Sequence, residues 1–93
     1  MLAVLIMIGF KIETETSNTE SVSLRKRQNK YSISILISSY QNITIVSIVK
    51  AATNQSKLNT FSSSECTKTL TYIKAIIDRI NKDKEFDAVV ASL

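Results

Sequence analysis

The sequence predicts a single domain of the α+β class, in which an antiparallel β-sheet is followed by a long and a short C-terminal helix. Between residues 30 and 38, apolar side chains largely alternate with serines, which is the period-2 pattern of a strand, and Ile43–Lys50 is a further β-branched run. From Ser62 onward the apolar residues recur at intervals of three and four, the period of an amphipathic helix. We therefore expect one domain over residues 1–93, with the sheet at about 2–61 and the helices at about 63–93.

The composition argues against an enzyme. The chain of 93 residues contains no histidine, one cysteine and one glycine. Histidine-activated nucleophiles, tetrahedral zinc centres and glycine-rich phosphate loops each need residues that this chain lacks. Cys66 falls on the apolar stripe of the predicted helix, so we expect a buried structural thiol there. We predict no catalytic residue, no metal, no cofactor and no small-molecule substrate.

The apolar run Met1–Phe10 has three competing interpretations. As a helix, ten residues would reach about 15 Å, half of a bilayer core, so the run is not a membrane span. A signal peptide would begin with basic residues and end at a small-residue cleavage site, and neither pattern is present. As a strand, the run is rich in residues that favour β structure, and Gly9 could mark a bulge or bend. We favour the strand.

The segments that follow are expected to alternate between strands and turns. Lys11–Thr16 has the period-2 pattern of a half-exposed strand, and residues 17–20 have turn composition. We interpret the polar, basic segment up to Asn29 as a long hairpin connection. Tyr31–Ser38 is the clearest strand, with its apolar residues on one face and its serines on the other. Residues 39–42 can turn the chain into a strand at Ile43–Lys50, and Ala51–Phe61 either continues that strand or forms a further one.

The C-terminal third is expected to be helical. Ser62 and Glu65 fit a capping box, which predicts a long helix from about Ser63 to Asn81 and a short one near Glu85–Leu93. A chain of this size has a thin core, and two helices are a thin cover for a sheet, so a partner subunit is expected. The dimer interface would be formed by the helical stripe of Leu70, Ile73, Ile77 and Ile80.

Excess positive charge is concentrated in the predicted sheet. The net charge is +4, and residues 1–64 hold seven basic and three acidic side chains. A basic cluster leads into a strand face of serines, where cations could bind phosphates and hydroxyls could reach sugars or base edges. The alternative is a solvated, charged loop. The candidate RNA-binding residues are Arg25, Lys26, Arg27, Lys30, Ser32 and Ser34.

The order of these segments resembles that of the coat proteins of single-stranded RNA bacteriophages (levivirus type). Arg27–Ile35 is similar to the basic turn and following strand of that family, and Ser62–Cys66 to the entry of its long helix. Lys84–Leu93 is similar to its short C-terminal helix. The resemblance implies a homodimer with one continuous sheet, helices that cross over the partner's sheet, and an icosahedral virion shell whose sheet faces single-stranded RNA. Because Glu13 and Glu15 lie near the basic cluster, we expect mostly electrostatic and weakly sequence-specific binding.

Two other functions compete with this one. The first is a small cytoplasmic regulatory or protein-interaction domain with an unknown partner. The second is a secreted or membrane-associated peptide led by Met1–Phe10.

Overall fold

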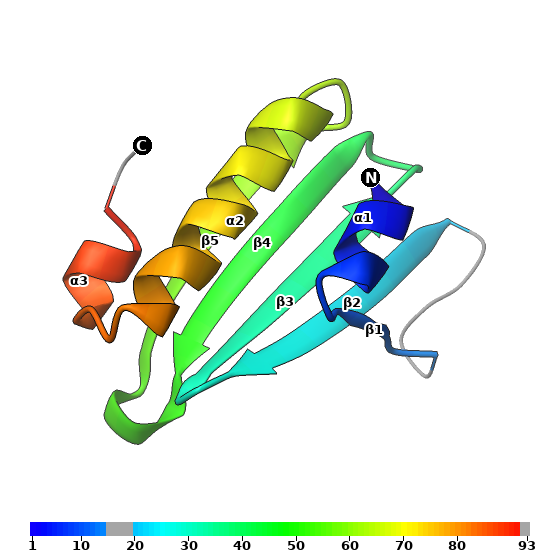
Figure 1. The fold of residues 1–93 in the computed structure, drawn as a ribbon. Coiled ribbons are helices and arrows are strands. Elements are labelled where there is room, and N and C mark those ends of the chain that lie inside the picture. Colours follow the sequence, from blue (N-terminus) through cyan, green and yellow to red (C-terminus); the bar gives the residue numbers. More distant parts are fainter. Residues whose placement is uncertain (15–19, 92–93) are drawn as a thin grey trace.

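A computed structural model describes residues 1–14 and 20–91 of the chain (Figure 1). It confirms the α+β class, because a five-stranded antiparallel sheet precedes the C-terminal helices. The elements in chain order are α1 (Leu2–Met7), β1 (Lys11–Ile12), β2 (Ser21–Gln28), β3 (Tyr31–Ser38), β4 (Ile43–Lys50), a 3-10 turn (Ala51–Thr53), β5 (Gln55–Ser62), α2 (Cys66–Asn81) and α3 (Phe86–Val89).

The strands follow one another across the sheet in the order β1-β2-β3-β4-β5. Asparagine occupies a left-handed backbone conformation in each of the three connections between β2 and β5, at Asn29, Asn42 and Asn54, with φ of 55°, 54° and 55°. Asparagine tolerates this conformation better than other non-glycine residues, since its short amide can hydrogen-bond locally. These residues let three tight hairpins form in a chain with a single glycine.

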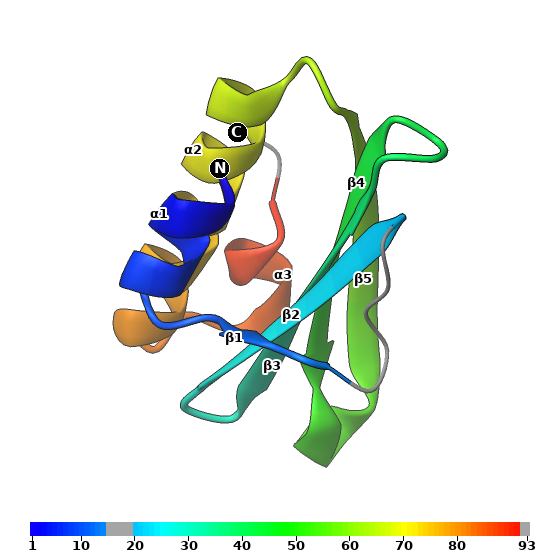
Figure 2. The ribbon, with the colours of Figure 1, turned by 90° about the vertical axis from the view of Figure 1, so that its right-hand side faces the viewer.

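All three helices lie against one face of the sheet (Figure 2). The side chains between the two layers form one continuous core, to which β3, β4 and α2 contribute most. Arg79 ties the C-terminal segment to the last turn of α2, because its Nη1 donates hydrogen bonds to the carbonyls of Val89 (3.1 Å) and Ala91 (2.8 Å). The core residues are Leu5, Phe10, Leu24, Tyr31, Ile33, Ile35, Val46, Ile48, Phe61, Tyr72, Ile73, Ile76, Ile80, Phe86 and Val89.

The apolar N-terminus is a helix, so the strand predicted for it is wrong. Residues 2–7 form α1, and Leu5 is fully buried in the core whereas Met7 is 83% exposed. A uniformly apolar run has no periodicity with which to distinguish a short buried helix from a strand. The suggested bend at Gly9 is present, with φ of +110°, a conformation that glycine adopts without steric cost. It turns the chain from α1 into β1.

The segment read as a hairpin connection is instead the regular strand β2, which pairs along its whole length with β3. Its alternating Val22 and Leu24 were the sequence signal for this strand, and the basic residues that follow obscured it. Conversely, the strand predicted for Lys11–Thr16 is reduced to β1. Thr14 lies in a turn, and Glu15 to Thr19, with most of the predicted turn at 17–20, fall outside the described residues. Residues 55–62 form a separate strand rather than a continuation of β4.

Helix α2 begins three residues later than predicted, and Cys66 is exposed rather than buried. Half of the capping box is present, because the Ser62 amide donates to Glu65 Oε1 at 2.9 Å. That bond and the Lys68 ammonium lower the pKa of Glu65. The buried side of α2 is centred on Ile73 and Ile76 and includes Thr69, whose hydroxyl donates to the Glu65 carbonyl at 2.8 Å. A threonine whose hydroxyl is satisfied within its own helix can be buried. Cys66 is the first residue of α2 and is exposed at that end of the helix.

The core position of α1 predicts a contrast between two residues of the same helix. We expect Leu5→Ala to lower the free energy of unfolding by about 2–4 kcal/mol, because it removes a fully buried side chain and leaves a cavity. Met7→Ala is the matched control and should change stability by less than about 0.5 kcal/mol. Urea denaturation followed by circular dichroism measures both. Equal effects of the two substitutions would contradict the placement of α1.

Candidate nucleic-acid interface

The sheet has a face on which no helix of the described chain packs, and we call it the open face (Figure 2). Side chains alternate along each strand, so the residues between the buried positions of β2, β3 and β4 point to this face. The register aligns them into rows across the sheet. One row runs from Arg25 through Ser34 and Ser47 to Leu58. The next runs from Arg27 through Ser32 to Val49.

Four of the six predicted RNA-binding residues lie together on the open face. Arg25 and Ser34 are cross-strand partners, and so are Arg27 and Ser32. Both arginines are exposed. The sheet therefore brings two guanidinium groups next to two hydroxyls. The alternation of β3 predicted the direction of the serines, but the arginines were expected in a loop.

The other two predicted residues do not join them. Lys26 is opposite the buried Ile33, so its side chain is directed to the helix-covered side, where it approaches Gly9. Alternation within β2 forces neighbouring residues onto opposite faces, which the loop predicted for this segment did not imply. Lys30 lies in the turn between β2 and β3 and is exposed at the end of the sheet.

The open face is hollowed along the Arg25 row. A shallow groove of about 260 Å³ is lined there by Arg25, Ser34 and Ser47, together with Leu36 and Ile45. Arg25 Nε lies 3.5 Å from Glu13 Oε1, and both side chains are partly exposed. An ion pair in such a setting is weak and readily exchanged. The guanidinium can therefore turn from this carboxylate to a phosphate oxygen of a bound polyanion.

Ser47 and Ser23 also belong to this surface, although neither was among the predicted residues. Ser47 stands opposite Ser34, and Ser23 lies one row away and also lines the groove. The signal for Ser47 was present, since it interrupts the apolar run of β4 at an open-face position. The surface can bind phosphates through its arginines and sugar hydroxyls through its serines. The described strand residues that face this side include no aromatic side chain.

The predicted dimer stripe is divided by the structure. Ile73 and Ile80 are buried in the core of their own chain, so their burial does not require a second subunit. Leu70 and Ile77 are only partly buried and lie seven residues apart, on the same side of α2. Helix α2 packs on the sheet of its own chain, and β5 has no neighbouring strand on its outer side within the described chain.

Comparison with protein-family models, curated proteins and solved structures found no match to this chain. In the described part of the chain, no helix is both long enough and apolar enough to cross a bilayer. Residues 1–14 and 20–91 also bring no three His, Cys, Asp or Glu side chains together in a way that could hold a metal ion.

The divided stripe predicts different outcomes for two isoleucines of α2. We expect Ile73→Asp to unfold the chain, because an unpaired carboxylate in the core costs several kcal/mol. Ile77→Asp should leave the chain folded, because its carboxylate can reach water. Circular dichroism and urea denaturation of both variants test this. Loss of the fold in Ile77→Asp would show that this position belongs to the core as well.

Proposed function

We propose that this chain is the coat protein of a single-stranded RNA bacteriophage, which dimerises, assembles into an icosahedral shell and holds RNA on the open face. The observation that supports this proposal most directly is the one-sided cover of the sheet. The helices occupy one face, and the other presents Arg25 and Arg27 beside rows of serine hydroxyls. The hairpin from β2 to β3 coincides with the segment Arg27–Ile35 that resembles the coat-protein family.

The physical chemistry of the open face suits a long polyanion better than a small ligand. Its groove is open to solvent along the sheet, and Arg25 and Arg27 stand in neighbouring rows beside it. Neutralising phosphates releases condensed counterions, which favours binding without any sequence readout. Serine hydroxyls are short, so a sugar–phosphate backbone can approach the sheet closely. Such an interface binds many RNA sequences with similar affinity, as a shell around a genome must.

The free edge of β5 supports the dimer in this proposal. The strand is eight residues long, contains neither proline nor glycine, and has its outer side unpaired within the described chain. Two copies related by a two-fold axis can pair their β5 strands in antiparallel fashion. The result would be one continuous sheet with both open faces on the same side. Leu70 and Ile77 remain partly exposed on the helix side, where a partner's helix could cover them.

The apolar part of the open face favours a second candidate function, a protein-interaction domain. Leu58 is 61% exposed, and Leu36, Ile43, Ile45 and Val49 are only partly buried. A contiguous apolar surface of this kind often marks a protein-binding site. A protein partner held by this patch would bind with little dependence on salt, whereas RNA binding weakens steeply as salt rises.

The orientation of the basic residues predicts a sharp difference between two double variants. Arg25→Gln with Arg27→Gln removes two cations from the open face, and Lys26→Gln with Lys74→Gln removes two that are not on it. The first variant should reduce the slope of log affinity against log salt by about 1.4, since each single-strand contact contributes about 0.7. The second has the same net charge and should leave the slope nearly unchanged.

Fluorescence anisotropy with a labelled single-stranded RNA, measured over a salt series, gives both slopes. Equal changes in the two variants would mean that binding follows net charge alone. Affinity that is independent of salt in the unmodified protein would argue for the protein-interaction function instead.

A further inference from the structure

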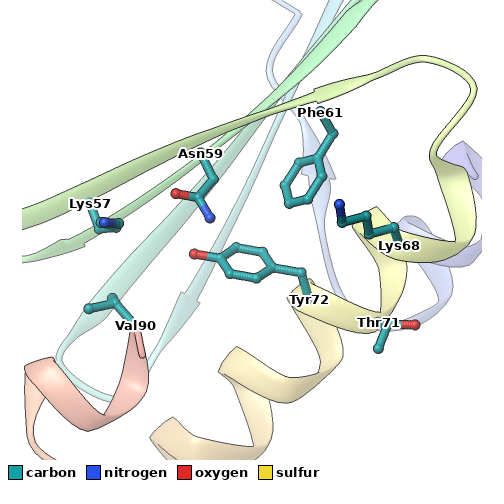
Figure 3. Close-up of a pocket in the computed structure, with 7 residues that line it drawn as sticks. All are labelled: Lys57, Asn59, Phe61, Lys68, Thr71, Tyr72 and Val90. Carbon is teal, nitrogen blue, oxygen red and sulfur yellow. The ribbon is translucent and has the colours of Figure 1, made fainter. Parts of the chain in front are cut away.

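A second hollow lies on the helix side of the sheet, between β5, α2 and the segment after α3 (Figure 3). We call it the β5–α2 cleft. Its volume is about 470 Å³, within the range of about 300–1,000 Å³ that is typical of small-molecule sites. It is separated from the open face by the sheet itself. The residues lining it are Lys57, Asn59, Phe61, Lys68, Thr71, Tyr72 and Val90.

The cleft exists because β5 carries polar side chains where the neighbouring strand carries core residues. Lys57 pairs with Ile48 and Asn59 with Val46, and both apolar partners are fully buried. The inward side of β5 therefore cannot close onto α2 with an apolar contact. Only Phe61, at the end of the strand, packs on the helix, with its ring 5.4 Å from that of Tyr72.

Tyr72 provides the observation that points to a ligand. The residue is 6% exposed, and its hydroxyl is buried with no hydrogen-bond partner among the described residues. Figure 3 shows this hydroxyl directed toward the space between Lys57, Asn59 and Val90. A buried polar group without a partner is unfavourable, and burial also raises the pKa of this phenol. The hydroxyl therefore stays protonated at neutral pH and is available as a donor.

We propose that the β5–α2 cleft binds a small organic carboxylate with an aromatic or aliphatic body. Lys57 has no ion-pair partner in the described chain, and no acidic side chain described here lines the cleft. The ammonium group of Lys57, the Asn59 amide and the Tyr72 hydroxyl can all donate to one carboxylate. The rings of Phe61 and Tyr72, with Val90, form the apolar wall for its body.

The second lysine of the cleft has a different role. Lys68 Nζ is 3.4 Å from Glu65 Oε2, so its charge is already partly balanced. It adds positive potential at the far end of the cleft without providing a free binding group. The cleft therefore fits a ligand with a single anionic group, placed at Lys57, and an apolar body better than it fits a dianion. Solvation on an edge strand would be enough to explain Lys57. It does not explain the buried hydroxyl of Tyr72, which has no partner among the described residues.

The test uses 2-naphthoate as the probe, with neutral 2-naphthamide and a cationic 2-naphthylmethylammonium as matched controls. Amide chemical shifts of the isotope-labelled protein locate binding and give the dissociation constant. We expect 2-naphthoate to shift residues of β5 and α2 around the cleft, the amide to bind more weakly, and the cation not to bind. Lys57→Met should weaken 2-naphthoate at least tenfold, and Tyr72→Phe about fivefold, as loss of a charged and a neutral donor implies.

Lys74→Met is the control variant, because Lys74 is exposed on the same helix but lies outside the cleft. It should bind 2-naphthoate like the unmodified protein. No shifts up to millimolar 2-naphthoate, or equal binding of the cationic analogue, would overturn the proposal. If a nucleoside monophosphate binds more tightly than 2-naphthoate, the cleft is a nucleotide site instead. If 2-naphthoate no longer binds when the protein dimerises, the partner subunit occupies the cleft. Tyr72→Phe should leave the affinity for RNA unchanged. The proposal for the cleft and the proposal for the open face can therefore be refuted separately.

Discussion

The burial of one side of β3 and β4 is the constraint on which the rest of the structure depends. Ile33, Ile35, Val46 and Ile48 are almost completely removed from water by the helices above them. Each such side chain contributes about 1.5–3 kcal/mol relative to an exposed one. Because side chains alternate along a strand, burying this set forces the intervening residues to the opposite face. The open face is thus a direct consequence of how the core forms.

The sequence was most informative where periodicity was regular and long. The strand β3 and the helix α2 were predicted correctly in type because their apolar residues recur with one period. The strand β4 was predicted from its run of β-branched residues between turn signals. The errors arose where that signal was missing or was masked. Met1–Phe10 is apolar throughout and has no period, and in β2 a run of basic residues hid the alternation that begins at Val22. Thr69 took a buried position that the apolar stripe could not reveal.

The same reasoning explains which part of the candidate interface was predictable. Ser32 and Ser34 were placed correctly because they alternate with isoleucines that must be buried. Lys26 was placed wrongly because a residue inside a strand has only two directions, and a loop assignment ignores this. The β5–α2 cleft was not predictable at all, since it depends on how far an edge strand and a helix are held apart by Lys57 and Asn59. Periodicity describes single elements and carries no information on such spacing.

We propose that the two faces of the sheet have different tasks, because the helix-covered face forms the core and the open face is left for RNA. The most direct test of that claim is assembly in the presence of nucleic acid. Purified protein is mixed with single-stranded RNA, and the products are examined by analytical ultracentrifugation, electron microscopy and nuclease digestion. The account predicts dimers that convert into closed shells in which the RNA is protected from nuclease. A protein that remains monomeric and leaves the RNA fully open to digestion would contradict it.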